Sequence, residues 1–302
     1  MQCVRCRHLL HWLVAAVILA LAPLPDANAD VLPETYLARS LAAHKFVMLG
    51  EKHDNPEHHR IQARLLAGLV AAGRRPAVVW EMIVRDKQPA IDAFAATGET
   101  DPDRFAEIVD WAGSGWPDWT YYRPIAEVAL AAGLPMVAGN IGRDAVRTIA
   151  RSPENVTPEL RTRLKLDEPL PENVEQAIGD EVYRGHCELV PREHLAPMVR
   201  VQIARDASLA EAMVRASGSA DGAVLIAGGQ HVRKDIGTGY HLRRRFGVDD
   251  VAAIALLERS GTEVAEPDLS LSRSFDFVWM TDKAHPEKNY CAELEARFSK
   301  HK

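Results

Sequence analysis

The chain has 302 residues, of which 26% are charged and 47% hydrophobic, and its formal net charge is −6 at pH 7. A net acidic protein has no field that attracts nucleic acid or an anionic membrane surface, so the charge argues against both as partners. This length fits one large domain, or one domain with an insertion.

The first 29 residues have the pattern of a cleavable secretory signal peptide. The basic start, the short apolar run and the small-residue cleavage triplet are, in order, Arg5 to His8, residues 13–22 and Ala27-Asn28-Ala29. The alternative is an N-terminal membrane anchor, but the run is shorter than the roughly 20 apolar residues that a span requires. We therefore expect an exported protein, periplasmic or secreted, with membrane association as the alternative. The mature chain would begin at Asp30 and contain no transmembrane segment.

Two of the four cysteines, Cys3 and Cys6, would leave with the signal peptide. Cys187 and Cys291 remain, which allows either one disulfide or two buried thiols. Nothing in their spacing resembles a zinc site.

Short apolar runs alternate with helical patterns along the mature chain. The predicted strands are Lys45–Gly50, Pro76–Glu81, Leu134–Gly139, Gly222–Gly228, Val251–Leu257 and Phe275–Met280. The first four are near-continuous apolar runs, as expected for strands of a parallel sheet that is covered on both faces. The segments between them are long enough for crossover helices. We therefore predict an α/β fold with a mostly parallel β-sheet and flanking helices.

The helix after the first strand has the clearest pattern. Asn55 can cap its start and Pro56 suits its first position, while Gly73 can end it. Residues 151–193 break the alternation because they are rich in Pro and Glu and contain no convincing strand. We predict a smaller, mostly helical insertion there, within a single domain that covers residues 30–302.

Polar side chains follow four of the predicted strands at the point where each strand ends. In a parallel sheet, ligands bind beyond the carboxyl ends of the strands. Residues 51 and 53 are two apart on extended chain, so their side chains point the same way. We therefore predict one functional pocket, formed by Glu51, His53, Glu81, Asn140 and His231. The alternative is a buried polar network that only orders the loops.

The same residues stand in motifs that resemble the ChaN family of haem-binding proteins, within the wider Tiki and erythromycin-esterase-like superfamily. The opening motif is Val47-Met48-Leu49-Gly50-Glu51-Lys52-His53-Asp54-Asn55-Pro56-Glu57-His58-His59 with Gln62. The next blocks are Trp80-Glu81-Met82 with Gln88, the segment from Trp111 to Ile125, and Val137-Ala138-Gly139-Asn140. The last are Gly185-His186-Cys187, Gln202 with Arg205-Asp206, and the run from Ala227 to Arg233. Together they cover most of residues 40–245, in the family's order.

The resemblance implies haem binding in iron acquisition, with haem near a dimer interface and tyrosine as an axial ligand. It also implies an α/β sheet with a smaller helical part, in agreement with the pattern of strands. Some family members are lipoproteins, whereas this signal peptide lacks the lipid-acceptor cysteine.

Haem iron is held in proteins by Tyr, His, Cys or Met side chains. Tyr183 is the first ligand candidate because it lies in the insertion, next to Arg184 and three residues before His186. Tyr122, in an aromatic cluster, is the second candidate, and the pair Tyr240-His241 is the third. For each tyrosine, the alternative is a half-buried, hydrogen-bonded ring.

Other side chains of the motifs have two interpretations each. Arg184, Arg205 or Arg233 could pair with haem propionates as bidentate donors. Arg205 and Asp206 could equally form a local ion pair on a helix. Cys187 could ligate iron, or it could be a small buried apolar residue.

Two functions of different classes follow from these residues. In the first, the mature domain captures haem for uptake or storage, with haem and a second copy of the chain as partners. In the second, the protein is a hydrolase. Its strand-end residues Glu51, His53, Glu81 and His231 would hold a divalent metal that activates water, or a histidine would act as general base without a metal. A third interpretation is a degenerate family member whose polar edge only supports the structure.

Overall fold

The computed structural model describes residues 34–259 and 271–299. The predicted signal peptide, residues 1–29, lies outside the described residues. Within the described part, no helix is long and apolar enough to cross a membrane.

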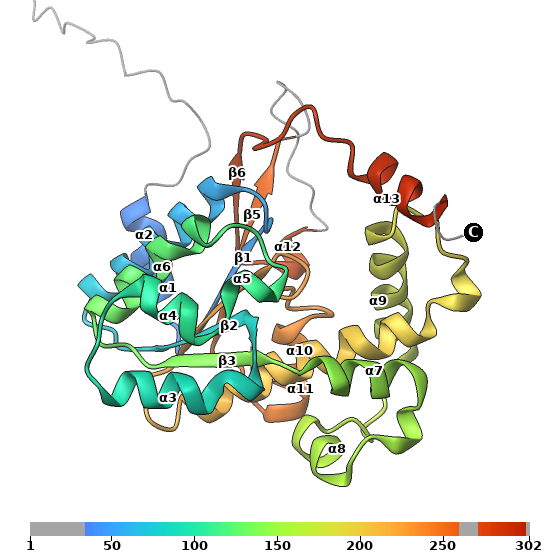
Figure 1. Cartoon of the computed structure of the whole chain (residues 1–302), viewed down its shortest axis with the longest axis horizontal. Helices are drawn as coiled ribbons and strands as arrows, with labels where there is room; N and C mark the ends of the chain where they lie inside the picture. The colour runs from blue at the N-terminus through green and yellow to red at the C-terminus, as the bar shows by residue number, and fades with distance from the viewer. Residues whose placement is uncertain (1–33, 260–270, 300–302) are drawn as a thin grey trace, which may run out of the picture. The chain divides into compact units, whose positions relative to one another are not determined.

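The centre of the described chain is a six-stranded sheet in which every neighbouring pair of strands is parallel (Figure 1). The strands are β1 (Phe46–Glu51), β2 (Ala77–Val84), β3 (Met136–Asn140), β4 (Ala223–Gly228), β5 (Val251–Glu258) and β6 (Phe277–Thr281), in the order β3-β2-β4-β1-β5-β6. The predicted α/β class, the parallel sheet and the six strands are confirmed. Strands β2 and β3 lie on one side of β1, whereas β5 and β6 lie on the other. The order of the strands therefore reverses beside β1 and β4, and a ligand site is expected at such a point.

Strand β2 is longer than its predicted range. The apolar residues Met82 and Ile83 follow Glu81 and are buried at 3% and 2% exposure, so the strand continues to Val84. The register between β2 and β3 shifts between Trp80 and Val84. Glu81 therefore lies inside an irregular part of the strand rather than at its end.

Helices cover both faces of the sheet. One face packs against α1 (Glu34–Ala42), α2 (Pro56–Ala71), α3 (Gln88–Ala96), α4 (Pro102–Ile108) and α6 (Trp119–Ala131), with the short η1 (Arg85–Lys87) and α5 (Trp111–Ser114) between them. The other face packs against α10 (Ala196–Ala216) and α11 (Thr238–Phe246). The α2 cap is as predicted: the Asn55 side chain accepts a hydrogen bond from the Glu57 amide, and Pro56 opens the helix.

The predicted insertion is confirmed as helical. It contains the end of α7 (Arg143–Arg151), η2 (Pro153–Asn155), α8 (Pro158–Leu164), α9 (Glu172–Gly185) and η3 (Arg192–His194). Figure 1 shows α7, α8 and α9 beside α10, beyond the end of the sheet. Ile178 and Val182 of α9 join Val199 of α10 in a separate apolar cluster. The long helix α10 thus connects the insertion to the sheet.

The chain ends in a segment that returns to the insertion. After α12 (Leu271–Ser274) and β6, helix α13 (Tyr290–Ser299) lies beside the end of α9 in Figure 1. A disulfide joins Cys187 to Cys291, across 104 positions of sequence. Of the two states left open by the sequence, the structure therefore has the disulfide. Cys187 is neither a buried thiol nor an iron ligand.

Candidate functional site

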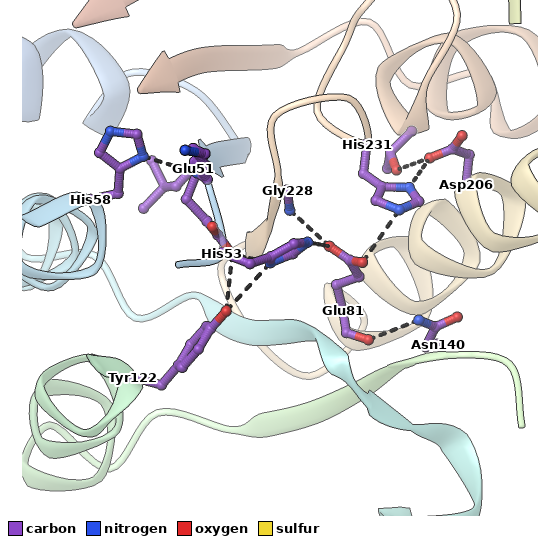
Figure 2. A network of polar contacts seen from close by, with 12 residues as sticks. Glu51, His53, His58, Glu81, Tyr122, Asn140, Asp206, Gly228 and His231 are labelled. Atoms are coloured by element: carbon purple, nitrogen blue, oxygen red, sulfur yellow. Dashed lines mark hydrogen bonds and ion pairs between the residues drawn. The ribbon is translucent and has the colours of Figure 1, made fainter. Parts of the chain in front are cut away.

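Four of the predicted pocket residues form a chain in which carboxylates and histidines alternate (Figure 2). His53 Nδ1 lies 2.6 Å from Glu51 Oε1, and His53 Nε2 lies 3.9 Å from Glu81 Oε2. His231 Nε2 lies 3.3 Å from the other Glu81 oxygen, and His231 Nδ1 lies 2.7 Å from Asp206 Oδ1. Strands β2, β4 and β1 lie side by side in this order, and their carboxyl-terminal parts, the loops after β1 and β4, and helix α10 bring these side chains together.

Tyr122 and Gly228 complete this chain. The buried Tyr122 hydroxyl on α6 donates to Glu51 Oε1 at 3.2 Å, and the Gly228 amide donates to Glu81 Oε2 at 2.7 Å. Gly228 has no room for a side chain, since an added Cβ would lie 2.8 Å from His53 Nε2. We call the set Glu51, His53, Glu81, His231, Asp206 and Tyr122 the strand-end network.

Asn140, the fifth predicted residue, belongs to the backbone rather than to the acid–histidine chain. Its amide nitrogen donates to the Glu81 carbonyl at 2.9 Å, and its oxygen accepts from the Ile141 amide. It therefore joins the ends of β2 and β3 and fixes the position of Glu81.

The charges of the network are balanced by neighbours. Burial lowers the pKa of His53, but the Glu51 and Glu81 carboxylates outweigh it and raise that pKa to about 9. Burial likewise opposes the charge of His231, yet Glu81 and Asp206 raise its pKa to about 10. Burial also disfavours the Glu81 carboxylate, but the His231 and His53 charges hold its pKa far below the usual range. At neutral pH the network therefore contains two imidazolium ions.

Only one member of the network reaches solvent to a useful extent. The His53 side chain is 34% exposed, whereas those of Glu51, Glu81 and Asp206 are at most 2% exposed. The Trp116 ring covers part of His53, with the ring centroids 4.7 Å apart. One buried atom, Glu51 Oε2, has no hydrogen-bond partner within the described residues. Any reaction at this site would therefore have to involve the His53 ring.

A second layer of side chains holds the loop that carries His53. His58 Nδ1 accepts from the Lys52 amide at 2.9 Å, and its Nε2 contacts Thr281 Oγ1 at 2.7 Å. His59 Nε2 contacts the His53 carbonyl at 3.1 Å. Burial lowers the pKa of His58 to about 4, so it stays neutral, as its acceptor role requires. The paired histidines of the opening motif thus shape the β1–α2 loop.

Asp206 was missed as a site residue by sequence reasoning. The sequence suggested an ion pair with its neighbour Arg205, but the Asp206 carboxylate contacts His231 and the Gln202 amide. Gln202 lies four positions before Asp206, one turn earlier on α10, and this spacing was the available signal. No spacing in the sequence indicated that Asp206 contacts His231, on the loop after β4.

The network does not have the features of a metal centre. Both ring nitrogens of His231 face carboxylates, so neither offers a lone pair to an ion. Across residues 34–259 and 271–299 there is no group of three or more His, Cys, Asp or Glu side chains placed to hold a metal. The divalent-metal interpretation of Glu51, His53, Glu81 and His231 has no support in the structure.

A cavity of about 180 Å³ lies on the other side of His231, between the insertion and the sheet. Its walls come from α9, α10 and the loop after β4, and consist of Ile178, Glu181, Val182, Gly185, His186, Gln202, Asp206, Gln230, Ile236 and Gly237. Asp206 lines this cavity and also contacts His231, so the cavity adjoins the strand-end network.

His186 is the haem-ligand candidate that lines this cavity. Its Nδ1 lies 2.7 Å from the Val182 carbonyl, to which it can only donate. The proton on Nδ1 leaves the lone pair of Nε2 free. A ligating histidine that donates its other nitrogen to a backbone carbonyl has this arrangement.

Tyr183 lies on a different side of α9. Its half-buried ring lies under the Arg192 guanidinium, 4.2 Å from the ring centroid, and it is not part of the cavity wall. Within the described part of the chain, its hydroxyl forms no hydrogen bond. The predicted pair Tyr183 and His186 thus shares one helix end but faces two environments.

The other candidates are less accessible or already paired. The Tyr122 hydroxyl is buried in the strand-end network, and Tyr240 and His241 are 8% and 0% exposed. Arg184 and Arg233 both pair with Glu181. Arg205 is half-buried, and its Nε is buried without a hydrogen-bond partner in the described residues.

Comparison with known proteins decides the family. A model for the family described as haem-binding uptake, Tiki superfamily, ChaN, matches residues 37–242. The chain belongs to this family. No curated protein sequence matches the chain.

One solved structure shares the fold of the chain. A structure of ChaN from Campylobacter jejuni, described as binding haem cofacially, is 19% identical to the chain. The match covers 80% of this chain and 89% of that one with a TM-score of 0.63, which shows a shared fold.

Two other structures are similar at lower TM-scores. A succinoglycan biosynthesis protein has a TM-score of 0.43 at 13% identity, covering 74% of this chain and 68% of that one. An erythromycin esterase has a TM-score of 0.40 at 17% identity, covering 76% and 75%. Scores this low carry no functional argument.

Proposed function

We propose that this ChaN-family protein binds haem at the carboxyl-terminal end of α9, with Tyr183 as the axial ligand. The observation that carries the proposal is the position of Tyr183 under the Arg192 guanidinium, with a hydroxyl that forms no hydrogen bond within the described residues. The hydroxyls of Tyr122 and Tyr290, by contrast, already donate to carboxylates. The Tyr183 ring is half-buried, at the helix end that carries His186. A phenolate bound to iron would have the Arg192 guanidinium beside it, which also pairs with Asp180 at 2.6 Å.

The surroundings of Tyr183 suit a porphyrin. Leu189, just beyond the helix, is 38% exposed and offers apolar surface. Arg205, on α10, has a buried Nε without a partner in the described residues and is the candidate propionate donor of the proposal. His186, with a free Nε2, is the alternative axial ligand, on the cavity side of the same helix.

We further infer that the protein is exported and serves iron acquisition. The predicted signal peptide supports export, and so does the Cys187–Cys291 disulfide, since disulfides persist in oxidising compartments. A homodimer with haem at its interface is part of the proposal. The similar Campylobacter jejuni protein, described as binding haem cofacially, supports haem as the ligand.

The test is a haemin titration of the mature chain, followed in the Soret region, with elemental analysis of the same sample. Tyr183→Phe keeps the ring but removes the ligand oxygen, so haem affinity should fall by more than about tenfold. Loss of an outer partner of a metal ligand alone costs roughly 10–100-fold. Tyr36→Phe is the matched control because Tyr36 lies on α1 and is 53% exposed. If Tyr183→Phe binds like the parent and His186→Ala loses the Soret shift, the ligand is His186.

Hydrolysis is the second candidate function, and the observation that favours it is the exposed His53 ring between two buried carboxylates. With a pKa of about 9, His53 would donate a proton at neutral pH and act as a general base only in alkaline solution. Ester cleavage that rises between pH 7 and 10 and disappears in His53→Gln would favour it. Stoichiometric zinc or manganese without a Soret shift would favour a metal-dependent enzyme instead.

A further inference from the structure

Residues 282–299, here called the C-terminal strap, connect the loop that carries His53 to the end of α9. Near its middle, the Tyr290 hydroxyl donates to Asp54 Oδ2 at 2.6 Å, and Lys288 Nζ lies 3.2 Å from the same oxygen. The next residue, Cys291, is bonded to Cys187 after the end of α9, and Figure 1 shows α13 beside α9. The strap therefore joins two parts of the molecule that both carry candidate site residues.

The strap is held with little help from packing. No residue of α13 is buried. A helix of ten residues without a buried apolar face is marginal in water. The disulfide and the polar contacts of Lys288 and Tyr290 with Asp54 and Lys52 are therefore the interactions that keep α13 in place. Removing the disulfide leaves only half-exposed polar contacts, which are weak.

The disulfide also holds the turn that ends α9. Cys187 and Glu188 have φ of 53° and 60°, a left-handed conformation that is disfavoured for residues with a Cβ. In this turn the Glu188 amide donates to the Tyr183 carbonyl at 3.0 Å, and the Leu189 amide donates to the His186 carbonyl at 3.1 Å. Two consecutive strained residues persist only where their surroundings impose them. The conformation of residues 183–189, here called the insertion turn, is therefore tied to the disulfide.

We propose that the Cys187–Cys291 disulfide is a redox clamp that sets haem affinity through the insertion turn. This inference rests on the proposed haem site. Cys291 is exposed and Cys187 half-buried, so a dithiol reductant can reach Cys291. A thiolate of the reductant attacks the Cys291 sulfur, and Cys187 leaves as a thiolate. The second thiol of the reductant then resolves the mixed disulfide. Two electrons and two protons pass to the cysteines, and the reductant becomes a disulfide.

The experiment compares the mature parent with the double variant Cys187→Ser, Cys291→Ser in two measurements. The first is haemin affinity. We expect the double variant to bind about tenfold more weakly, a difference well within reach of a Soret titration. The second is limited trypsin digestion without haem, which should cleave the variant faster after Lys288 and Arg297, both in the strap. A dithiol added before digestion should accelerate cleavage of the parent and leave the variant's rate unchanged.

The two measurements separate the clamp from the haem site. If the oxidised parent binds no haem, the proposed function fails and the clamp fails with it. If the parent binds haem and the variant binds equally well, the clamp is wrong, whatever the digestion shows. If cleavage after Lys288 is the same in both proteins, the disulfide does not hold the strap, and the inference is overturned on that ground alone.

Discussion

The strand-end network and the insertion turn both contain a histidine that contacts carboxylate or carbonyl oxygens. They differ in how many polar atoms are left without a partner. In the network, both nitrogens of His231 and both oxygens of Glu81 already have partners. In the insertion turn, His186 Nε2 and the Tyr183 hydroxyl do not have one within the described residues. Groups that are saturated internally fix structure and charge, whereas groups with a free lone pair are available to a ligand.

Their supports differ as well. Three neighbouring parallel strands and α10 position the network, and its acids are fully buried. One disulfide and two residues with positive φ hold the insertion turn. We therefore expect mutations in the network to change stability and mutations in the turn to change ligand binding.

The largest expected effect is on stability, from His231→Ala. The change leaves Glu81 and Asp206 facing each other without the charge between them. Removing one member of a buried ion pair costs about 3–5 kcal/mol. Urea unfolding of the parent and the variant measures the loss. His186→Ala is the control, and it should cost only about 1 kcal/mol because it removes one hydrogen bond near the surface. Equal losses in the two variants would contradict the distinction between the regions.

A second, smaller effect is expected from pH. The folded pKa values of His53 and His231, about 9 and 10, lie above the unfolded value of 6.5. Their protonation therefore stabilises the folded state fully below pH 6.5, and this contribution is lost as the pH rises through 9 and 10. The loss should be smaller than in His231→Ala, because half of His231 is still charged at pH 10.

Urea midpoints at pH 6 and pH 10 check this dependence. Glu81 has the opposite sign: its pKa is lowered, so its contribution disappears as the pH falls below 4.5. The His231→Ala variant should show a flatter profile between pH 6 and 10 than the parent does. A parent whose stability rises over that interval would show that the histidines are neutral in the folded state.

The sequence allowed the fold and most of the network to be predicted, because both depend on regular geometry. Near-continuous apolar runs located the strands, and parallel strands bring the residues at their carboxyl ends together, which placed His53 beside Glu81. The role of Asp206 was not predicted, because Asp206 lies on helix α10 and no periodicity indicates which strand end a helix residue contacts. Asn140 lies beside Glu81, but its backbone role depends on the β2–β3 register shift, which no sequence pattern reveals.

The helix end was harder to interpret than the sheet. Residues 183 and 186 are three apart, and the spacing suggested one shared face. The helix ends just before Cys187, which has a positive φ. The Tyr183 ring lies under Arg192, whereas His186 lines the cavity beside α10. Two cysteines allowed a disulfide, but only the fold shows that the chain end returns to α9. Long-range closure of this kind depends on tertiary packing rather than on local pattern.

The smallest effect is expected from Tyr122→Phe. This variant distinguishes the two regions as haem sites, because Tyr122 was also a haem-ligand candidate. Tyr122→Phe removes one hydrogen bond to the Glu51 carboxylate and keeps a ring that packs against His59 and Trp111. A hydrogen bond to a charged group is worth about 1.5–3 kcal/mol, and His53 still holds the same Glu51 oxygen, so the loss of stability should lie at the lower end. The haem spectrum should not change, since the hydroxyl is buried and its proton is held by Glu51. Urea unfolding and a haemin titration of the same preparation give both numbers. An altered Soret band in Tyr122→Phe, with Tyr183→Phe unchanged, would move the haem site from the insertion turn to the strand-end network.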